Sequence, residues 1–342
     1  MEFNYTGAFD QFPMKCNRFV FFFLFSVVFT HIQAFQKENT LLIVSNIPET
    51  LLGPGRILER EIDAETLRLV YYHQNAASHN LTFHAFIRND GITTANLSFI
   101  RSEGGPSRDG IFVGHKTTRT FLSLLSQNQY KNLTIGPGVG KSILFQNVTP
   151  LSIVSGILQI LNPDRMPLHL KLHIIDPEYR HLSSLNETEA PYKGAVFTES
   201  FRKKTILLDC NQPLYEIRIG DKPFLRDNVT GIELKGNYGL LYSIQIQLVN
   251  ASPTFRQVTL YYAPRGGIGR GTMLIEDKMM ETSLFRLEDY LSPEKVYSLT
   301  LNPGQNKHVS LLTMPQAGSF YPVSLIIQSE PVLRIAELSD EY

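Results

Sequence analysis

The residues with the most chemical potential accompany two glycine-rich segments, GGPSRDG at residues 104–110 and RGGIGRG at residues 265–271. Arg108, Asp109 and His115 lie in or just after the first segment, and Arg265 and Arg270 lie in the second. Guanidinium, carboxylate and imidazole groups bind charged and hydrogen-bonding ligands, and binding residues are concentrated in loops. We predict that these five residues form a recognition surface. The alternative is that they are solvated turn residues.

A third glycine-rich stretch, GPGVGKS at residues 136–142, suggests a phosphate-binding loop. That motif needs a glycine five residues before Gly140, and Ile135 stands there. The next residues, ILFQNV, indicate a strand rather than the helix whose N-terminus would hold a phosphate. The GGIGRG segment also lacks the spacing of a dinucleotide site. We predict structural turns at both places and no cofactor.

The sequence gives weaker indications of a metal site or a catalytic site than of a recognition surface. His169 and His173 share one face of an expected strand, but four residues of strand separate them by roughly 13 to 14 Å. Glu59, Glu61, Asp63 and Glu65 crowd an expected hairpin, where acidic residues are typical of a solvated face. Cys210 follows the strand-like ILLD and is expected in the core. We assign no catalytic residue and no metal site.

The fold must position these residues, and the sequence that forms it contains an internal repeat. Asn89 and Asn250 each end an alternating apolar run, LTFHAFIRN and YSIQIQLVN, and lie 161 residues apart. The glycine-rich segments keep this offset, and later turns, NLTIGPGVGK and SLTLNPGQNK, match at an offset of 166. An offset that only drifts upward is typical of a duplicated unit with loop insertions.

The chain divides into four predicted parts. Residues 1–34 are an N-terminal extension and signal peptide, with Met14 as the expected start and an apolar stretch from Phe19 to about Thr30. Residues 35–175 form the first domain, residues 176–194 a polar linker, and residues 195–338 the second domain. About 12 apolar residues are too few to span a bilayer, so we expect cleavage, and an uncleaved anchor would be the only membrane attachment.

Cysteine and charge content limit the cellular compartments and the partners that the sequence allows. Cys16 lies in the predicted signal, so a mature chain carries Cys210 alone and forms no internal disulfide, which favours a bacterial envelope. Glycosylation in a eukaryotic secretory pathway is the alternative, because there are eight Asn-x-Ser/Thr triplets. Their asparagines are Asn4, Asn80, Asn96, Asn132, Asn147, Asn186, Asn228 and Asn250. Lys and Arg (32) balance Asp and Glu (32) without long runs, so no nucleic-acid partner is expected.

Period-two alternation in LTFHAFI, LHLKLHII, SIQIQLV and other runs predicts half-buried strands in an all-β fold of two antiparallel β-sandwiches. Each copy also has one helix-like insertion, TTRTFLSLLSQNQ from Thr117 and TSLFRLEDYLS from Thr282. The strand ends RNDGITTANLSFI and LVNASPTFRQVTLYY, with the later PG turns, resemble the immunoglobulin-like and fibronectin-type modules of exported bacterial proteins. The paired cysteines and buried tryptophan of antibody domains are absent.

The sequence therefore favours an exported, non-enzymatic binding or structural protein of the cell envelope or extracellular space, with a protein or glycan partner. The alternative is a carbohydrate-active or hydrolytic protein with its site in a cleft between the two domains. A third hypothesis is an assembly subunit that donates or accepts a strand. Fold alone does not decide among them.

Overall fold

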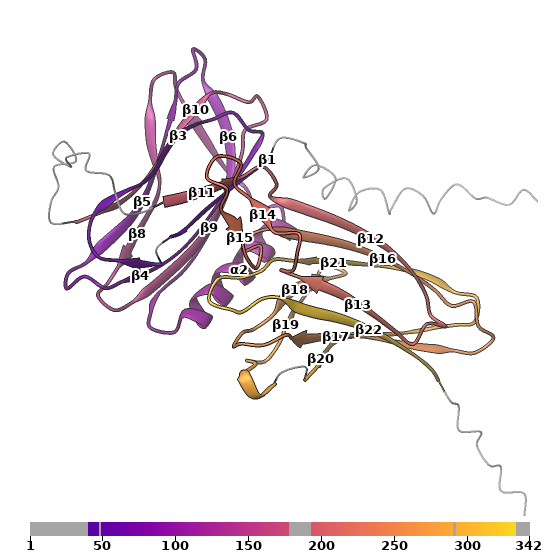
Figure 1. The fold of residues 1–342 in the computed structure, drawn as a ribbon. Coiled ribbons are helices and arrows are strands. Elements are labelled where there is room, and N and C mark those ends of the chain that lie inside the picture. The colour runs from indigo at the N-terminus through magenta and orange to yellow at the C-terminus, as the bar shows by residue number, and fades with distance from the viewer. Residues whose placement is uncertain (1–39, 48, 178–192, 290–291, 333–342) are drawn as a thin grey trace, which may run out of the picture. The chain divides into compact units, whose positions relative to one another are not determined.

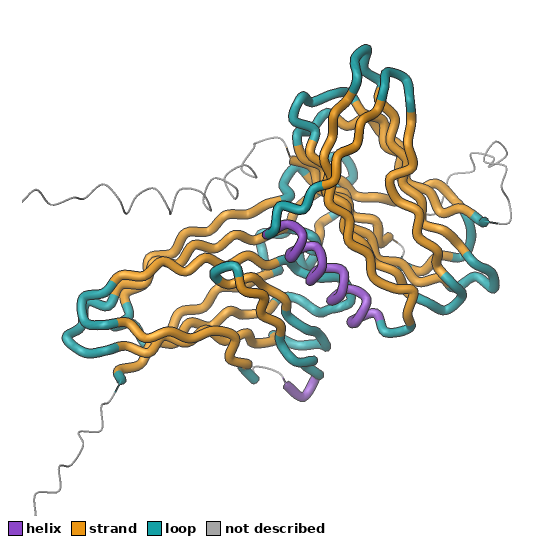
Figure 2. The backbone as a smooth tube through the Cα atoms, turned by 180° about the vertical axis from the view of Figure 1, so that it is seen from behind, coloured by secondary structure: helices purple, strands orange, loops and turns teal. Residues whose placement is uncertain are grey.

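The computed structural model describes residues 40–47, 49–177, 193–289 and 292–332 (Figure 1). The predicted signal peptide and most of the predicted linker lie outside these ranges. The described residues are predominantly β, with 58% strand and 7% helix, as expected from the alternating runs. Figure 2 shows the strands of the described residues in two groups, with the long helix lying where the groups meet. Among the described residues, no helix is both long enough and apolar enough to cross a membrane.

Two sheets make up the first half of the molecule, which we define as β1 to β11. The larger sheet has the order β11-β1-β4-β9-β6-β7, with β2 also paired to β4, and the smaller has the order β3-β10-β5-β8. The strands are β1 (Thr40–Ile47), β2 (Thr50–Leu51), β3 (Gly55–Ile62), β4 (Thr66–Asn75), β5 (Leu81–Asn89), β6 (Ala95–Ser107), β7 (Lys131–Ile135), β8 (Gly140–Val148), β9 (Ile153–Leu161), β10 (Leu168–Ile175) and β11 (Lys193–Phe197).

The second half, β12 to β22, contains three sheets. Their orders are β12-β16-β21-β18-β19, β13-β22-β17-β20 and β14-β15. The strands are β12 (Phe201–Asp209), β13 (Leu214–Ile219), β14 (Leu225–Arg226), β15 (Glu233–Leu234), β16 (Leu241–Val249), β17 (Arg256–Pro264), β18 (Thr272–Ile275), β19 (Lys278–Glu281), β20 (Glu294–Leu301), β21 (Asn306–Thr313) and β22 (Val323–Pro331).

The core of the first half lies between its two sheets, where the alternating runs place their apolar side chains. In β10 every second residue is buried, as the sequence LHLKLHII predicts. Tyr71 of β4 stacks on Phe83 of β5 with ring centroids 4.2 Å apart, which joins the two sheets. Gly156 of β9 lies against the Tyr71 ring, so any Cβ at this position would overlap the ring.

The two halves repeat one strand order. The antiparallel series β4-β9-β6-β7 has the same sequence order as β13-β22-β17-β20, and the antiparallel pair β5-β8 matches β16-β21. Asn89 is the last residue of β5 and Asn250 directly follows the matching strand β16, and both side chains are fully buried. Each side-chain amide donates to the backbone carbonyl four residues later, at 2.7 and 2.9 Å, and to the carbonyl of Ile135 or Leu301.

The helix predictions have different outcomes. In the first half, α2 (Gly110–Ser126) covers most of the predicted segment, but it begins seven residues before Thr117 and ends three residues before Gln129. In the second half the helix prediction is wrong, because the described residues there contain only a 3-10 turn at Leu287–Asp289. Reciprocal backbone hydrogen bonds between Gly269 and Phe285, at 3.1 and 2.8 Å, hold this segment extended against the glycine-rich loop. The helix-like spacing of the apolar residues in TSLFRLEDYLS therefore wrongly predicted a helix.

The domain division remains a prediction. Residues 37–342 form one compact unit, and β11, which straddles the predicted start of the second domain, pairs with β1 of the first half. Side-chain contacts also cross between the halves, as described below. The two halves therefore provide a shared surface on which a binding site can form.

Candidate functional site

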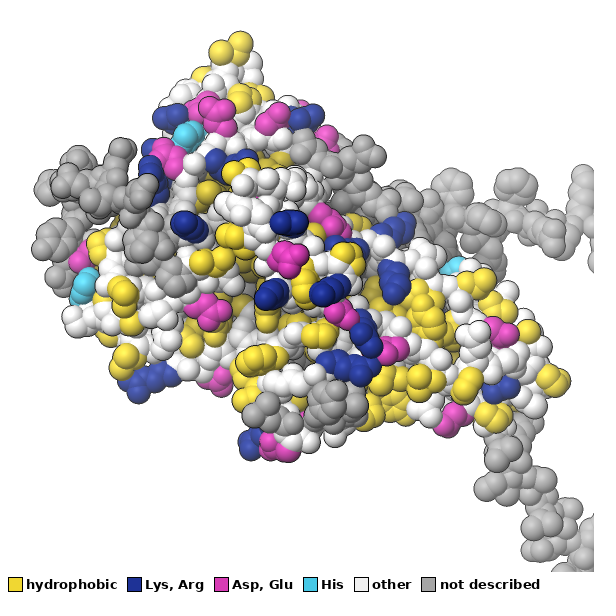
Figure 3. Space-filling model, viewed as in Figure 1, with side chains coloured by type: hydrophobic (Ala, Val, Ile, Leu, Met, Phe, Trp, Pro, Cys, Tyr) yellow, Lys and Arg dark blue, Asp and Glu magenta, His cyan; other side chains and the backbone are white. Residues whose placement is uncertain are grey.

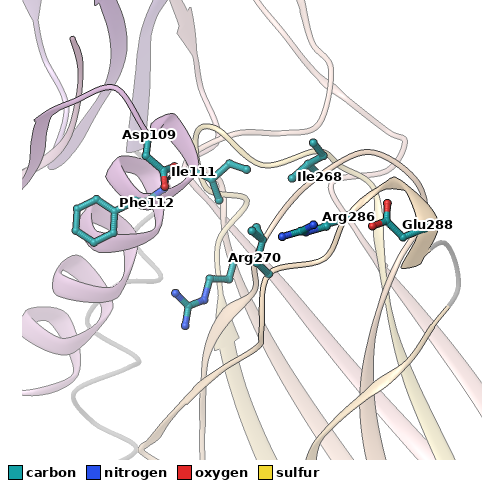
Figure 4. Close-up of a pocket in the computed structure, with 8 residues that line it drawn as sticks. Asp109, Ile111, Phe112, Ile268, Arg270, Arg286 and Glu288 are labelled. Carbon is teal, nitrogen blue, oxygen red and sulfur yellow. Dashed lines mark hydrogen bonds between the residues drawn. The ribbon is translucent and has the colours of Figure 1, made fainter.

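A pocket of about 560 Å³ lies between the start of α2 and loops of the second half (Figure 4). Three of its lining residues come from the first half and five from the second. They are Asp109, Ile111 and Phe112, and Ile268, Arg270, Leu284, Arg286 and Glu288. The pocket thus brings together the two glycine-rich segments that the sequence singled out.

The first wall is fixed by the way α2 begins. The pairing of β6 with β9 shifts register between Gly104 and Ser107, which ends the strand just before the helix. Asp109 is the N-cap residue, and its carboxylate accepts a hydrogen bond from the Phe112 N–H at 2.9 Å. Ile111 and Phe112 follow in the first turn, and the Phe112 side chain is half exposed. The cap therefore sets the position of this wall.

The second wall is held by hydrogen bonds around Arg270. The Arg270 N–H donates to Ser319 Oγ at 3.2 Å, and its Nε donates to the Thr282 carbonyl at 2.8 Å. Among the described residues, no hydrogen bond to the Arg270 Nη groups is recorded, so these donors can serve a ligand. Arg286 is exposed beside it, with its backbone N–H bonded to the Asp289 carboxylate at 2.7 Å. Two guanidinium groups therefore line the pocket.

The pocket lining combines charge with apolar surface. Ile111, Phe112, Ile268 and Leu284 provide the apolar part, while Arg270 and Arg286 provide guanidinium groups, which commonly bind carboxylates. On the face of the molecule in Figure 3, basic and acidic side chains are mixed and form no large patch of one sign. Selectivity would therefore come from the pocket rather than from long-range charge.

His115 lies on α2 four residues after Ile111 and connects the two halves. Its Nε2 is 2.7 Å from Glu281 Oε2, and its Nδ1 is 2.9 Å from Thr272 Oγ1. Glu281 also accepts from Arg119 Nε at 2.6 Å. Burial lowers the pKa of His115 more than the hydrogen bond to Glu281 raises it. Burial alone would raise the pKa of Glu281, but hydrogen bonds from Arg119 and His115 outweigh that effect and lower it.

The structure does not bring all five predicted residues together. Asp109 and Arg270 line the pocket, and His115 supports it from the buried side of α2. Arg108 is exposed and does not line it. Arg265 is elsewhere, since its guanidinium pairs with Glu216 and donates to Ser324 Oγ at 2.6 Å. That group is a structural ion pair joining residues of β13 and β22.

Sequence reasoning missed six of the lining residues. They are Ile111, Phe112, Ile268, Leu284, Arg286 and Glu288. Leu284, Arg286 and Glu288 were assigned to a helix that does not form, so their common orientation was hidden. Ile268 is the one apolar residue in RGGIGRG, and that was the signal by which it could have been found.

The remaining motifs take structural roles. GPGVGKS forms the turn that follows β7 and the start of β8, and the Gly138 N–H in this turn donates to the Asn89 carbonyl at 2.8 Å. His169 contacts Glu59 and Asp90 at 3.0 and 3.6 Å on the outer face of the smaller sheet. Cys210 is buried, as expected. Within the described ranges no group of three or more His, Cys, Asp or Glu residues could hold a metal ion.

Cross-strand bonding gives a structural role to four of the Asn-x-Ser/Thr triplets. These lie on the paired strands β6 and β7 or at β5 and β8, where hydroxyls of one triplet donate to the asparagine of the other. The bonds are Ser98 to Asn132, Thr134 to Asn96 and Thr82 to Asn147, at 3.2, 3.3 and 3.0 Å. The asparagine of a fifth triplet, Asn250, is fully buried, which leaves no room for a glycan there.

Comparisons with known proteins give little further information. No family model matches the chain, and no curated protein matches it. Among solved structures, Lac15 from a marine microbial metagenome aligns with 8% identity over 86% of this chain at a TM-score of 0.17. The chain spans only 63% of the length of Lac15.

Two other solved structures align over much of the chain. The tandem CBM22-1-CBM22-2 domain of Paenibacillus barcinonensis Xyn10C aligns with 13% identity over 77% of this chain and 74% of its own, at a TM-score of 0.15. The delta-endotoxin Cry8Ea1 of Bacillus thuringiensis aligns with 10% identity over 70% and 53%, at a TM-score of 0.20. TM-scores this low support no inference about fold or function.

Proposed function

We propose that this chain is a non-enzymatic binding protein that holds a segment of a partner protein in the pocket between its two halves. The observation that carries the proposal is the lining of that pocket, where Arg270 and Arg286 lie beside Phe112 and Leu284. This combination suits a peptide in which a carboxylate adjoins an apolar side chain. Asp109 already serves as a helix cap, which favours binding over acid–base chemistry.

We further propose that the two halves are immunoglobulin-like modules that arose by internal duplication. The repeated strand order supports this, and so do the matching bonds of Asn89 and Asn250. Their acceptors Ile135 and Leu301 lie 166 residues apart, which is the offset of the later sequence matches. After duplication, the glycine-rich segments of both copies contribute to one pocket.

The proposed place of action is outside the cytoplasm, either in the cell envelope or in the extracellular space. The support is the sequence of residues 14–34, with basic residues before a short apolar stretch. A binding role for exposed loops is compatible with that setting.

A selection from a random peptide library on the full chain tests the binding proposal. We expect the selected peptides to share an Asp or Glu next to a large apolar residue. They should lose binding to the double variant Arg270→Gln, Arg286→Gln and keep it with Arg108→Gln, which removes an exposed guanidinium outside the pocket. Peptides that bind the double variant as tightly as the unchanged protein would contradict the proposal.

The alternative, a hydrolytic or carbohydrate-active protein, places its site at the same junction. Two carboxylates, Asp109 and Glu288, line the pocket, and a carboxylate pair is what glycoside hydrolysis requires. An assay with chromogenic glycosides distinguishes the two functions. Turnover that is abolished by Glu288→Gln would favour the alternative, whereas no turnover together with peptide binding favours the binding protein.

A further inference from the structure

A second pocket, of about 300 Å³, lies between the halves and shares no lining residue with the first. Its lining residues are Val44, Asn46, Glu49, Val70, Tyr71, Tyr72, Tyr238, Ala317, Gly318, Ser319 and Phe320. The backbones of Gly318 and Gly110 touch beside it, so closely that a Cβ at Gly318 would overlap the Gly110 carbonyl. This contact brings the loop of residues 317–320 against the start of α2.

Four of the lining residues are aromatic. Tyr71 is buried and stacks on Phe83 in the core, so Tyr72, Tyr238 and Phe320 are the more accessible rings. Tyr238 is held in place, because its hydroxyl donates to the Ser319 carbonyl at 2.9 Å and its ring packs edge-on against Tyr321 at 5.7 Å. Phe320 is 61% exposed, an unusual state for a large apolar ring. Tyr72 is half-buried in β4. The rings provide a fixed aromatic lining with one exposed member.

Glu49 supplies the only acidic side chain among the residues that line this pocket. No hydrogen bond or ion pair to its carboxylate is recorded within the described part of the chain, and burial raises its pKa. Its charge is close enough to act on two of the rings. Burial and then Glu49 raise the pKa of Tyr72 and of Tyr238, each to about 12. A carboxylate therefore lies beside aromatic rings with no cation from the described chain to balance it.

We propose that this second pocket binds an alkylammonium group. A cation is attracted by the faces of aromatic rings, and combining such rings with a carboxylate favours an ammonium over a neutral group of the same shape. A volume of about 300 Å³ is at the small end of ligand pockets, which suits one ammonium head group rather than a larger molecule. The inference concerns a different pocket and a ligand of opposite charge from the peptide site, and it does not depend on that proposal.

Two sources of an alkylammonium group exist, a small free amine and the lysine side chain of a partner. Calorimetric titration of the full chain with choline chloride tests the first, and titration with N-acetyl-lysine methylamide tests the second. Each probe has a neutral counterpart of similar shape, 3,3-dimethyl-1-butanol and N-acetyl-norleucine methylamide. We expect at least one cationic probe to bind and its neutral counterpart to bind at least tenfold more weakly.

Two variants connect such binding to the pocket. Glu49→Gln removes the charge and Phe320→Ala removes the exposed ring, and we expect each to weaken binding of the cation about tenfold or more. Glu61→Gln is the matched control, because Glu61 is an exposed acid of β3 away from the pocket, and it should leave binding unchanged. Equal binding of charged and neutral probes, absence of binding by both cations, or unchanged affinity in Glu49→Gln would each overturn the proposal.

Discussion

His115 shows how a residue chosen for its chemistry becomes a structural contact. Its ring is buried between α2 and the β18-β19 hairpin, with Glu281 on one nitrogen and Thr272 on the other. Because burial lowers its pKa, the ring is neutral near pH 7. The Nε2–H then donates to the Glu281 carboxylate, and Nδ1 lies beside the Thr272 hydroxyl, which also contacts Gln316 Oε1 at 3.2 Å.

This arrangement predicts a loss of stability on acidification. The pKa of His115 is lower in the folded protein than in the unfolded chain, so the unfolded state takes up the proton first as the pH falls below about 6.5. The free energy of unfolding should then fall by at most about 1.4 kcal/mol per pH unit from this residue. Urea titrations at pH 7.5 and 5.5 should show a larger loss for the unchanged protein than for His115→Gln.

The comparison between these two proteins isolates His115. His84 and His173 also have pKa values lowered by burial, but both remain in the variant and contribute equally to the two titrations. Equal losses of stability in the two proteins would show that His115 does not titrate in this way.

The residues of the pocket were only partly predictable. Asp109 and Arg270 could be singled out because charged side chains in glycine-rich segments indicate exposed loops, and both line the pocket. Arg265 satisfies the same rule, yet it pairs with Glu216, which lies 49 residues away in the sequence. The rule describes local chain geometry and contains no information on which distant carboxylate a guanidinium will meet. That information exists only after the strands have paired.

At the scale of elements, strands were easier to predict than helix limits. Alternation identified β5, β10 and β16 because each has one buried face. The start of α2 was placed too late because Gly110, Val113 and Gly114 do not look like a helix beginning. Val113 and Gly114 are buried where the helix packs closely, and Gly114 contacts the Ala317 backbone of the second half. Tertiary contact therefore outweighed helix propensity there.

The cap of α2 gives a prediction for this element. Replacing Asp109 by Ala removes the acceptor for the Phe112 N–H and should lower the free energy of unfolding by about 1 kcal/mol. Asp109→Asn keeps a side-chain oxygen in the same place and should lose much less. Urea unfolding followed by far-ultraviolet circular dichroism measures both. An equal loss in the two variants would mean that the charge of Asp109, and not its capping bond, stabilises the helix.

At the scale of the whole molecule, Arg68 of β4 connects the two halves. Its side chain is almost completely buried and donates to Gln159 Oε1 at 3.0 and 2.6 Å, to the Gly239 carbonyl at 3.2 Å and to the Ser200 carbonyl. Its guanidinium also lies 5.5 Å from the Phe121 ring centroid. Burial lowers the pKa of Arg68 to about 10, so the group stays protonated at neutral pH.

No sequence pattern indicates this connection. Arg68 lies in the strand-like RLVYY, where alternation leaves open whether it faces solvent or the second half. Its partners Ser200 and Gly239 are 132 and 171 residues away, and both bind through backbone carbonyls, which every residue has. The internal repeat in the sequence made a repeated strand order in the two halves predictable. The residues through which the halves contact each other could not be predicted from the sequence.

Removing Arg68 should therefore weaken the contact between the halves as well as the first half itself. Arg68→Met keeps much of the buried volume but removes the donor of Gln159 Oε1 and of the Gly239 carbonyl, and it leaves the Ser200 carbonyl with the Leu241 N–H as its donor. We therefore expect a loss of about 3 kcal/mol in the free energy of unfolding. Arg101→Met is the matched control, because the Arg101 side chain is 44% exposed in its ion pair with Glu103 and should contribute less than about 1 kcal/mol.

Hydrogen exchange locates the effect of the Arg68 substitution. If Arg68 connects the halves, the amides of residues 198–202 and 237–242 in the second half should exchange faster in Arg68→Met and remain unchanged in Arg101→Met. Faster exchange confined to β4 and β9 would show instead that Arg68 stabilises the first half alone. The Ser200 and Gly239 carbonyls accept from one guanidinium nitrogen, so the two segments should lose protection together.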